Sequence, residues 1–220
     1  MTDTAVERAS KLDTATLSDA LDKLRILGQC YKVAPRDHGF RMTGRAYTVL
    51  YGPASNPPGT VGDYLDQVQP GQVVVLDNGA RDDATVWGDI LTEMAHVKGV
   101  AGTVIDGICR DSALCIELGY PVFSRGAWMR TGKDRVQVEA EQVPVTIGGA
   151  RVAPGDILRG DADGVVVIPQ EHEAAVLDAA EAIAQAEVGI RKAVRAGMSI
   201  TEARQRYGYH KLQTAGQDGE

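Results

Sequence analysis

Arg110 and Asp111 form a charged pair that directly follows a predicted strand. They end the segment IDGICRD, which comes after an apolar run over Val100–Ile105 that is typical of a buried strand. Charges at the C-terminal end of a parallel strand face the crevice in which α/β proteins bind ligands. Arg110 offers parallel donors for a carboxylate, and Asp111 offers oxygen ligands for a divalent cation such as magnesium or manganese. The alternative is an exposed ion pair in which Asp111 caps the next helix.

A second candidate site is the segment Trp87–Leu91, WGDIL, which is expected near the start of a helix. Free backbone N–H groups and the helix dipole make such a start an anion site that needs no cationic side chain. Gly88 would let a ligand approach the backbone closely. Alternatively, Gly88 serves the packing of the helix on a strand, and Asp89 favours the first helical turn electrostatically.

Hydrophobic periodicity predicts the elements that position these residues. A capping-box pattern at Thr16–Asp19 indicates the start of an amphipathic helix. Arg45–Tyr51 and Gln72–Leu76 are predicted strands, the second apolar enough to be covered on both faces. Apolar residues at helical spacing over Thr85–Val97 predict a helix, and the strand at Val100–Ile105 follows at once. Strand, helix and strand in this order form a βαβ unit with parallel strands.

The second half of the chain changes character. A short helix near Ser112–Leu118 leads to a strand that begins at Pro121, and Val136–Pro169 shows the alternation and turns of consecutive strands. A long Ala- and Glu-rich helix follows, and Ser199–Tyr207 predicts a short last one. Because no linker or repeat interrupts the pattern, we expect a single α/β domain over residues 1–220.

The composition excludes several classes of protein. Lys and Arg total 23 against 30 for Asp and Glu, which gives a net charge of −7, and aromatic residues make up only 5%. A nucleic-acid partner is therefore disfavoured, because phosphates need clustered cations and bases need stacking partners. The three cysteines form no CxxC, so neither a disulfide framework nor a cysteine zinc site is indicated. No leader or membrane-spanning stretch stands out, which predicts a cytoplasmic protein without a membrane partner.

Familiar catalytic motifs are missing from the sequence. There is no GxGxxG after a strand, no HExxH and no GxSxG, and the stretch Gly126–Asp134 has the wrong spacing for a phosphate-binding loop. A Schiff-base lysine needs a desolvated amine, and none of the lysines lies within a predicted apolar strand. The Arg110–Asp111 pair and the WGDIL segment therefore remain the two candidates.

Together, these two motifs resemble the RraA-like family. That family contains the bacterial regulator of ribonuclease E activity A and the class II 4-hydroxy-4-methyl-2-oxoglutarate/4-carboxy-4-hydroxy-2-oxoadipate aldolases. The resemblance covers most of the chain and is carried by the following stretches: TLSDALD (Thr16–Asp22), VVLDNG (Val74–Gly79), WGDIL (Trp87–Leu91), GTVIDGICRD (Gly102–Asp111), LGYPVF (Leu118–Phe123) and VAPGDILRGDADGVVVIP (Val152–Pro169). It implies a β/β/α layered domain of the swivelling type, with N- and C-terminal helices, that assembles into homotrimers or homohexamers with active sites at subunit interfaces.

The resemblance also implies roles for individual residues. In the aldolase branch the acidic residue of the Arg-Asp pair holds the divalent metal, which corresponds to Asp111 here, and the arginine, here Arg110, holds the pyruvyl moiety. The pyruvyl carboxylate meets the helix start that corresponds to Gly88, Asp89, Ile90 and Leu91. An acidic residue from the neighbouring subunit's C-terminal helix also contributes in that branch, and Glu187 lies at the corresponding place. The ribonuclease-regulator branch lacks the metal aspartate and the intact glycine-led loop, so the aldolase branch is the better match.

The predicted reaction is a metal-dependent retro-aldol cleavage of a short 4-hydroxy-2-oxo acid to pyruvate and a second oxo acid. Asp89 and Glu187 are candidates to hold the water that takes the 4-hydroxyl proton. Oxaloacetate decarboxylation would be a side activity, because it leaves the same pyruvate enolate. The alternatives are a non-catalytic protein that binds and inhibits a ribonuclease, and a lyase for a different oxo acid. The candidates for binding a distal carboxylate are Arg36, Arg41, Arg125 and Arg130.

Overall fold

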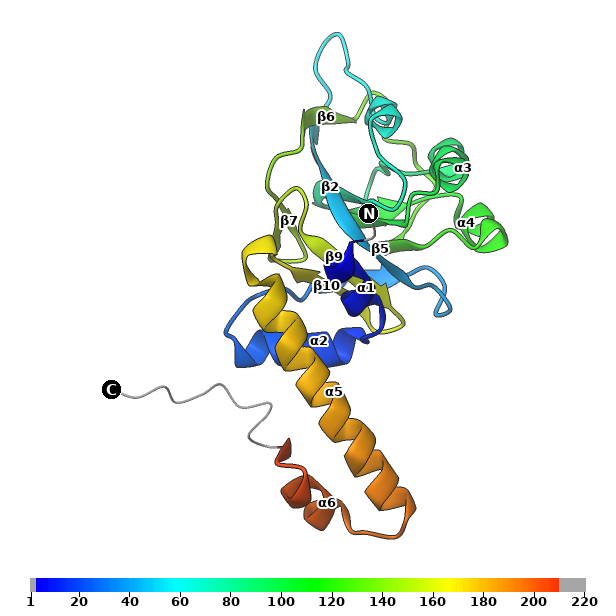
Figure 1. Cartoon of the computed structure of the whole chain (residues 1–220). Coiled ribbons are helices and arrows are strands. Elements are labelled where there is room, and N and C mark those ends of the chain that lie inside the picture. Colours follow the sequence, from blue (N-terminus) through cyan, green and yellow to red (C-terminus); the bar gives the residue numbers. More distant parts are fainter. Residues whose placement is uncertain (1–2, 210–220) are drawn as a thin grey trace.

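Within residues 3–209, which the computed structural model describes, eight strands form one mixed sheet (Figure 1). They are β1 (Ala34–Pro35), β2 (Met42–Pro53), β3 (Val73–Arg81), β4 (Gly102–Cys109), β5 (Val122–Ala127), β6 (Val136–Glu141), β9 (Ile157–Asp161) and β10 (Gly164–Ile168). The order is β1-β5-β4-β3-β2-β9-β10, and β6 pairs with β2. The neighbours β2 to β5 are parallel, which confirms the predicted βαβ unit.

Helices and a second, small sheet complete the layers of this fold. The small sheet is the antiparallel hairpin of β7 (Val145–Ile147) and β8 (Ala150–Val152). The helices are α1 (Thr4–Ser10), α2 (Thr14–Lys23), α3 (Asp89–Lys98), α4 (Ser112–Leu118), α5 (Glu173–Arg195), α6 (Ile200–Arg206) and the short 3₁₀ helices η1 (Asp63–Asp66) and η2 (Gln170–His172). The predicted β/β/α fold with helices at both ends is confirmed, and α1 is an addition that the sequence analysis did not include.

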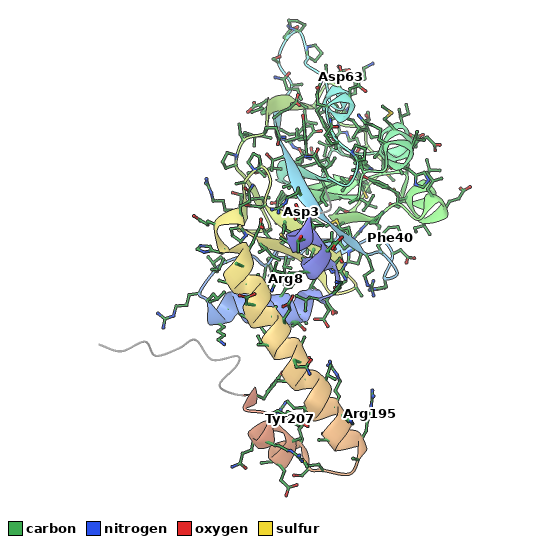
Figure 2. The ribbon with its side chains drawn as sticks, in the orientation of Figure 1. Asp3, Arg8, Phe40, Asp63, Arg195 and Tyr207 are labelled. Carbon is green, nitrogen blue, oxygen red and sulfur yellow. The ribbon has the colours of Figure 1, made fainter. Side chains whose placement is uncertain are left out.

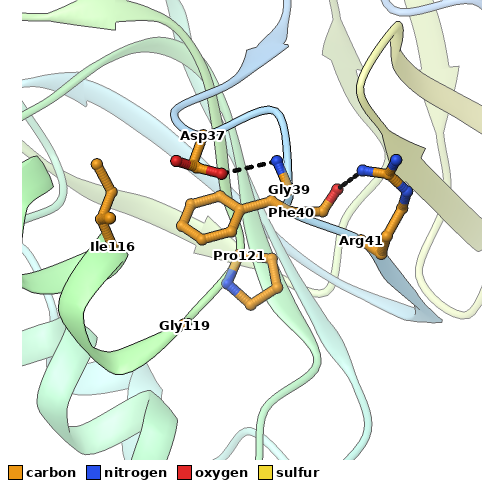
Figure 3. A pocket seen from close by; sticks show the side chains of 7 residues that line it. All are labelled: Asp37, Gly39, Phe40, Arg41, Ile116, Gly119 and Pro121. Atoms are coloured by element: carbon orange, nitrogen blue, oxygen red, sulfur yellow. Dashed lines mark hydrogen bonds between the residues drawn. The ribbon is translucent and has the colours of Figure 1, made fainter.

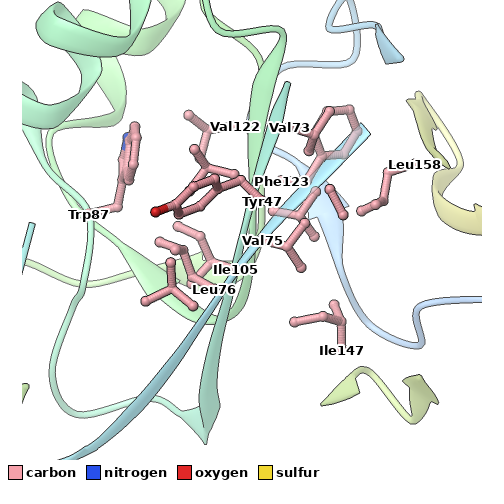
Figure 4. Close-up of a cluster of buried hydrophobic side chains, with 14 of the residues drawn as sticks. Tyr47, Val73, Val75, Leu76, Trp87, Ile105, Val122, Phe123, Ile147 and Leu158 are labelled. Atoms are coloured by element: carbon pink, nitrogen blue, oxygen red, sulfur yellow. The ribbon is translucent and has the colours of Figure 1, made fainter. Parts of the chain in front are cut away.

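The larger hydrophobic core lies around the parallel strands and explains why they read as continuous apolar runs. Every residue of β4 is buried, as expected for a parallel strand that is covered on both faces. Leu76 and Ile105 are register partners on the neighbouring strands β3 and β4, and Trp87, from the segment that precedes α3, belongs to the same buried cluster (Figure 4). The functional segment WGDIL is therefore anchored in the core by its own tryptophan.

A second core joins the two ends of the chain. Leu17 and Leu21 of α2 pack with Ile168 of β10 and with Leu177 and Ile183 of α5, and all five are fully buried. The C-terminal part of α5 then runs away from the sheet and carries α6 at its end (Figure 1). None of the helices within the described residues is long and apolar enough to cross a membrane.

On the surface, α1 is tied to α5 by charge. The Arg8 guanidinium donates to Glu181 Oε1 at 2.7 Å and to Asp178 Oδ1 at 2.6 Å (Figure 2). Arg45 of β2 bridges Asp3 at the start of α1 to Glu173 at the start of α5. These pairs hold the N-terminal segment against the C-terminal helix.

The start of α2 differs from the prediction. The helix begins at Thr14 rather than at Thr16, because Asp13 supplies the cap: its Oδ1 accepts from the Thr16 N–H at 2.7 Å. The buried carboxylate of Asp161, at the end of β9, accepts from the Thr14 N–H at 2.8 Å and from the Thr14 hydroxyl at 2.6 Å. Burial would raise the pKa of Asp161, but these hydrogen bonds and the nearby charge of Arg159 outweigh burial and lower the pKa.

Two boundaries near the candidate site also differ. The helix predicted from Thr85 begins only at Asp89, because Thr85 forms a β-bridge with Thr131 instead. β4 does not end at Ile105 but continues to Cys109. It can do so because the buried Asp106 is neutralised by an ion pair with Arg125 and accepts from the Gly148 N–H at 3.0 Å.

We expect Asp161→Asn to destabilise the protein in a pH-dependent way. A carboxyl whose pKa is lowered in the folded state stabilises it above the unfolded-state pKa, here about 3.8, and that stabilisation is lost as the pH falls through the folded-state value. The variant should therefore lose about 1 kcal/mol of unfolding free energy at pH 7, and the difference should shrink below about pH 4. Urea unfolding at several pH values measures this. The exposed Asp82→Asn is the control, and a difference that is constant with pH would contradict the expectation.

Candidate functional site

The candidate site is built where the start of α3 meets the end of β4. Gly88 is the N-cap residue of α3, and the Asp89 N–H donates to Asp111 Oδ2 at 3.1 Å. A Cβ atom on residue 88 would stand 2.9 Å from Asp111 Oδ2 and 3.0 Å from Arg110 Nε. The two predicted motifs are therefore in direct contact, and a side chain on residue 88 would displace the ends of both charged side chains.

Arg110 and Asp111 form an ion pair that remains open to solvent. Arg110 Nε lies 3.3 Å from Asp111 Oδ2, and the side chains are 37% and 39% exposed. Asp111 occupies the N-cap position of α4 with a left-handed backbone, φ 55°, but its side chain makes no capping hydrogen bond. The alternative interpretation is therefore confirmed for the exposed ion pair and for the N-cap position of Asp111, but not for a side-chain cap, because Asp111 Oδ2 accepts from the Asp89 N–H instead.

A chain of buried hydrogen bonds fixes the backbone of the site. The Trp87 indole N–H donates to the Thr92 hydroxyl at 2.9 Å, and that hydroxyl donates to the Gly88 carbonyl oxygen at 2.8 Å. The Arg110 N–H donates to the Trp87 carbonyl oxygen at 3.0 Å. The Trp87 ring stacks on Tyr120, with centroids 6.1 Å apart. Such a network positions the start of α3 relative to the end of β4.

The cysteine nearest to this network is not a nucleophile. Burial raises the pKa of the Cys115 thiol, and the hydroxyl of Thr92, 3.4 Å from Sγ, offsets this rise only in part. A buried thiol that stays protonated is a structural group rather than a reactive one. Arg110, Asp111 and the backbone at the start of α3 therefore remain the candidate groups of this site.

A cavity of about 700 Å³ opens in front of the start of α3. Gly88, Asp89, Ile90, Leu91 and Arg110 line it, so the structure brings together all five residues predicted to bind substrate. Its other walls come from η1 and the Gly59–Gly62 segment before it, and from the loop between β5 and β6: Gly59, Thr60, Val61, Gly62, Asp63, Leu65, Asp66, Thr131, Gly132 and Lys133. This volume suits a small organic acid.

The residues around Asp111 fit a divalent cation of the magnesium type. Among the described residues no group of three or more His, Cys, Asp or Glu side chains could hold a metal ion. Magnesium, however, keeps several waters and needs only one or two protein carboxylates. Asp111 Oδ2 is engaged by Asp89 and Arg110, and within residues 3–209 no protein donor engages its Oδ1. This oxygen is the candidate ligand.

Glu187, in contrast, does not reach the cavity of its own chain. It lies on α5, whose C-terminal part runs away from α3 and the sheet (Figure 1). Its carboxylate accepts from Arg191 Nη1 at 3.0 Å and from the Tyr209 hydroxyl at 3.2 Å. A role for Glu187 at the site therefore requires a second copy of the chain.

None of the four arginines considered for a distal carboxylate lines the cavity. Arg36 donates to main-chain carbonyls, and Arg125 pairs with Asp106. Arg41 borders a different cavity, of about 420 Å³, and donates to the carbonyl oxygens of His38 and Phe40 (Figure 3). The sequence analysis did not propose Lys133, which lines the candidate cavity from the stretch that was rejected as a phosphate-binding loop.

Comparison with known proteins agrees with the resemblance. A family model described as RraA-like: Aldolase/RraA matches residues 14–167. A Halalkalibacterium halodurans protein named "Putative 4-hydroxy-4-methyl-2-oxoglutarate aldolase" is 36% identical over 77% of this chain and 79% of its own length. Protein DlpA of Legionella pneumophila is 37% identical over 90% of this chain, but the chain spans only 33% of that relative. The solved structure of Streptomyces coelicolor RraAS2, described as an unusual member of the RNase ES inhibitor RraA protein family, matches with a TM-score of 0.80 and 30% identity, over 87% of this chain and 97% of that one.

We expect Gly88→Ala to weaken cation binding without unfolding the protein. The backbone at residue 88 suits alanine, but the new Cβ would displace Asp111 Oδ2 and Arg110 Nε. The dissociation constant for Mn²⁺, measured by electron paramagnetic resonance, should rise about tenfold, and the melting temperature should change little. Gly126→Ala is the matched control, because its Cβ would meet only Ile108 at 3.7 Å. Unchanged Mn²⁺ affinity in Gly88→Ala would contradict this expectation.

Proposed function

The chain belongs to the RraA-like family of aldolases and RraA proteins, and on this premise we propose that it is a divalent-metal-dependent class II aldolase. Its substrates would be 4-hydroxy-4-methyl-2-oxoglutarate or 4-carboxy-4-hydroxy-2-oxoadipate, cleaved to pyruvate and a second oxo acid. The observation that carries the proposal is the contact of Asp111 with the glycine-led start of α3. The resemblance implies that the ribonuclease-regulator branch, which this chain matches less well, lacks both parts of that contact.

The pyruvyl end of the substrate would bind between Arg110 and the start of α3. The first N–H groups of a helix have no partner within the helix and attract anions. Here the Asp89 N–H donates to Asp111 and the Ile90 N–H donates to the Asp89 carboxylate, whereas within the described residues the Leu91 N–H has no acceptor. A substrate carboxylate would take the Leu91 N–H and replace Asp89 at the Ile90 N–H.

In the cleavage, the electrons of the 4-hydroxyl O–H bond form the new carbonyl group at C4, those of the C3–C4 bond form the C2–C3 double bond, and those of the 2-oxo π bond move to the oxygen. The C3–C4 bond breaks, its electrons pass into the 2-oxo group to give the pyruvate enolate, and the 4-hydroxyl loses its proton as the second oxo acid forms. A proton then adds to C3 to give pyruvate. When bound, a divalent cation supplies Lewis-acid stabilisation of the developing negative charge. Arg110 adds a fixed positive charge at the same end of the cavity.

We assign the role of accepting the 4-hydroxyl proton to a water molecule that the carboxylates of Asp89 and Glu187 would hold. Asp89 lines the cavity, and its carboxylate is released from the Ile90 N–H when substrate binds there. We propose that Glu187 of a neighbouring copy faces the same space in a homotrimer or homohexamer. This assignment is consistent with the position of Glu187 on α5, away from the cavity of its own chain.

We expect pyruvate release from both hydroxy-oxo acids to depend on Mg²⁺ or Mn²⁺ and on Asp111. Coupling to lactate dehydrogenase measures the release. EDTA should abolish it, and Asp111→Asn should lower kcat/KM by at least about a hundredfold, because the variant keeps the size of the side chain but loses the charge that holds the cation. Asp82→Asn is the control. If no substrate turns over and the protein instead captures and inhibits a ribonuclease, the ribonuclease-inhibitor function replaces this proposal.

We also expect the protein to decarboxylate oxaloacetate. Loss of carbon dioxide from oxaloacetate leaves the same pyruvate enolate as the aldol cleavage, so both reactions need the stabilisation by Arg110. Arg110→Lys keeps the charge but loses the bidentate geometry, and it should slow both reactions by a similar factor, about tenfold or more. Parallel assays of pyruvate release from the two substrates measure this. A variant that loses aldol cleavage but decarboxylates oxaloacetate at the original rate would contradict a shared enolate.

A further inference from the structure

The cavity holds a second cation, Lys133, whose function no motif indicates. Arg110 and Lys133 are the two basic residues that line the cavity within the described part of the chain. Arg110 is already paired with Asp111, whereas no carboxylate among the described residues pairs with the Lys133 ammonium group. Arg110 extends from the end of β4 and Lys133 from the loop between β5 and β6, so two different walls of the cavity carry one cation each.

The loop that carries Lys133 is held firmly against the segment before α3. Thr85 and Thr131 form a β-bridge, and the Thr85 N–H donates to the Arg130 carbonyl oxygen at 3.0 Å. A Cβ on Gly132 would collide with the Thr85 carbonyl oxygen, so the two backbones are in close contact. The backbone that presents Lys133 is therefore fixed relative to the WGDIL segment, which is only two residues beyond Thr85.

The Lys133 end of this loop is fixed as well. The Lys133 N–H donates to the Thr131 hydroxyl at 3.2 Å. The Arg135 guanidinium donates to the carbonyl oxygens of Thr131 at 3.3 Å and of Lys133 at 3.2 Å. Only the flexible side chain of Lys133 is left free to adjust its reach into the cavity.

The other charges of the cavity direct an anion toward Lys133. Asp63 and Asp66 line the wall formed by η1. Lys98 holds the backbone of η1 in place, because its ammonium group donates to the main-chain oxygens of Leu65 at 2.9 Å and of Asp66 at 2.8 Å. A carboxylate near η1 would meet the like charges of Asp63 and Asp66, and such repulsion is one way in which a site discriminates between ligands.

We propose that Lys133 binds the distal carboxylate of the substrate, so that the site selects 2-oxo acids that carry a second carboxylate over those with a neutral tail. This inference rests on the proposed function, because it places the pyruvyl end at Arg110. Lys133 acts as a cation and not as a Schiff-base amine, since its side chain is exposed and a Schiff-base lysine needs desolvation. A lysine is a point charge on a flexible stem, so one residue serves distal carboxylates of different position.

Binding of two non-cleavable acids tests the role of Lys133 without turnover. Pyruvate carries the 2-oxo acid group alone, and 2-oxoglutarate adds a distal carboxylate. In calorimetric titrations of the Mg²⁺-loaded protein, the wild type should bind 2-oxoglutarate more tightly than pyruvate. Lys133→Ala should weaken 2-oxoglutarate binding about tenfold and leave pyruvate binding unchanged. Lys133→Arg should keep the preference, Lys133→Glu should reverse it, and the exposed Lys11→Ala is the matched control.

The outcomes separate this inference from the aldolase proposal. If the wild type cleaves its substrates but Lys133→Ala keeps the wild-type preference for 2-oxoglutarate, the role of Lys133 is wrong and the aldolase stands. If Lys133→Ala weakens the binding of pyruvate and of 2-oxoglutarate equally, Lys133 supports the site as a whole and does not select the distal carboxylate. If the preference is lost in Lys133→Ala but the wild type cleaves neither hydroxy-oxo acid, recognition of dicarboxylates stands and the aldolase proposal fails. If neither acid binds to the wild type, both fail.

Discussion

One carboxylate oxygen, Asp111 Oδ2, joins the two halves of the functional site. It accepts from the first N–H of α3 and lies beside the Arg110 guanidinium, in space that a side chain on residue 88 would enter. This contact has local costs. A left-handed backbone at a non-glycine residue is unfavourable by about 1–2 kcal/mol, and α4 lacks a side-chain cap that is typically worth about 1 kcal/mol. The buried Trp87–Thr92–Gly88 hydrogen bonds and the stacking of Trp87 on Tyr120 stabilise the start of α3 and so help to offset these unfavourable terms.

The carboxyl ends of the parallel strands explain why the chemistry sits beyond β4. Asp77 of β3 and Asp106 of β4 are register partners at this edge of the sheet, where ligands of α/β proteins commonly bind. Both carboxylates accept hydrogen bonds from the backbone of the β7–β8 hairpin. Asp77 accepts from the Thr146 N–H at 2.9 Å, and Asp106 accepts from the Gly148 N–H at 3.0 Å. These aspartates therefore fasten the second sheet layer to the first, and the residues left for ligands are those after the strand end.

The sequence predicts the parts of this site that depend on local pattern. The helix that follows Trp87, the parallel strand before Arg110 and the βαβ order all follow from periodicity and turn residues, and the structure confirms them, although the helix begins four residues later than predicted. The end of β4 could not be predicted, because Asp106 is an acceptable strand residue only in the presence of Arg125 and the Gly148 N–H. Lys133 was missed for a similar reason. It reaches the cavity through the pairing of Thr85 with Thr131, a contact between distant segments that no local pattern signals.

The charge balance of the cavity gives a physical reason for a divalent cation in the proposed reaction. Asp63, Asp66 and Asp89 line the cavity and Asp111 borders it through Gly88, whereas Arg110 and Lys133 are its cations within the described residues. Four carboxylates and two cations leave a net charge of 2 − 4 = −2. An anionic oxo acid would enter this space against repulsion, and a divalent cation held by Asp111, as proposed, would restore neutrality before the oxo acid binds. The same balance explains why the distal carboxylate needs a cation of its own, since Arg110 is already shared between Asp111 and the pyruvyl end.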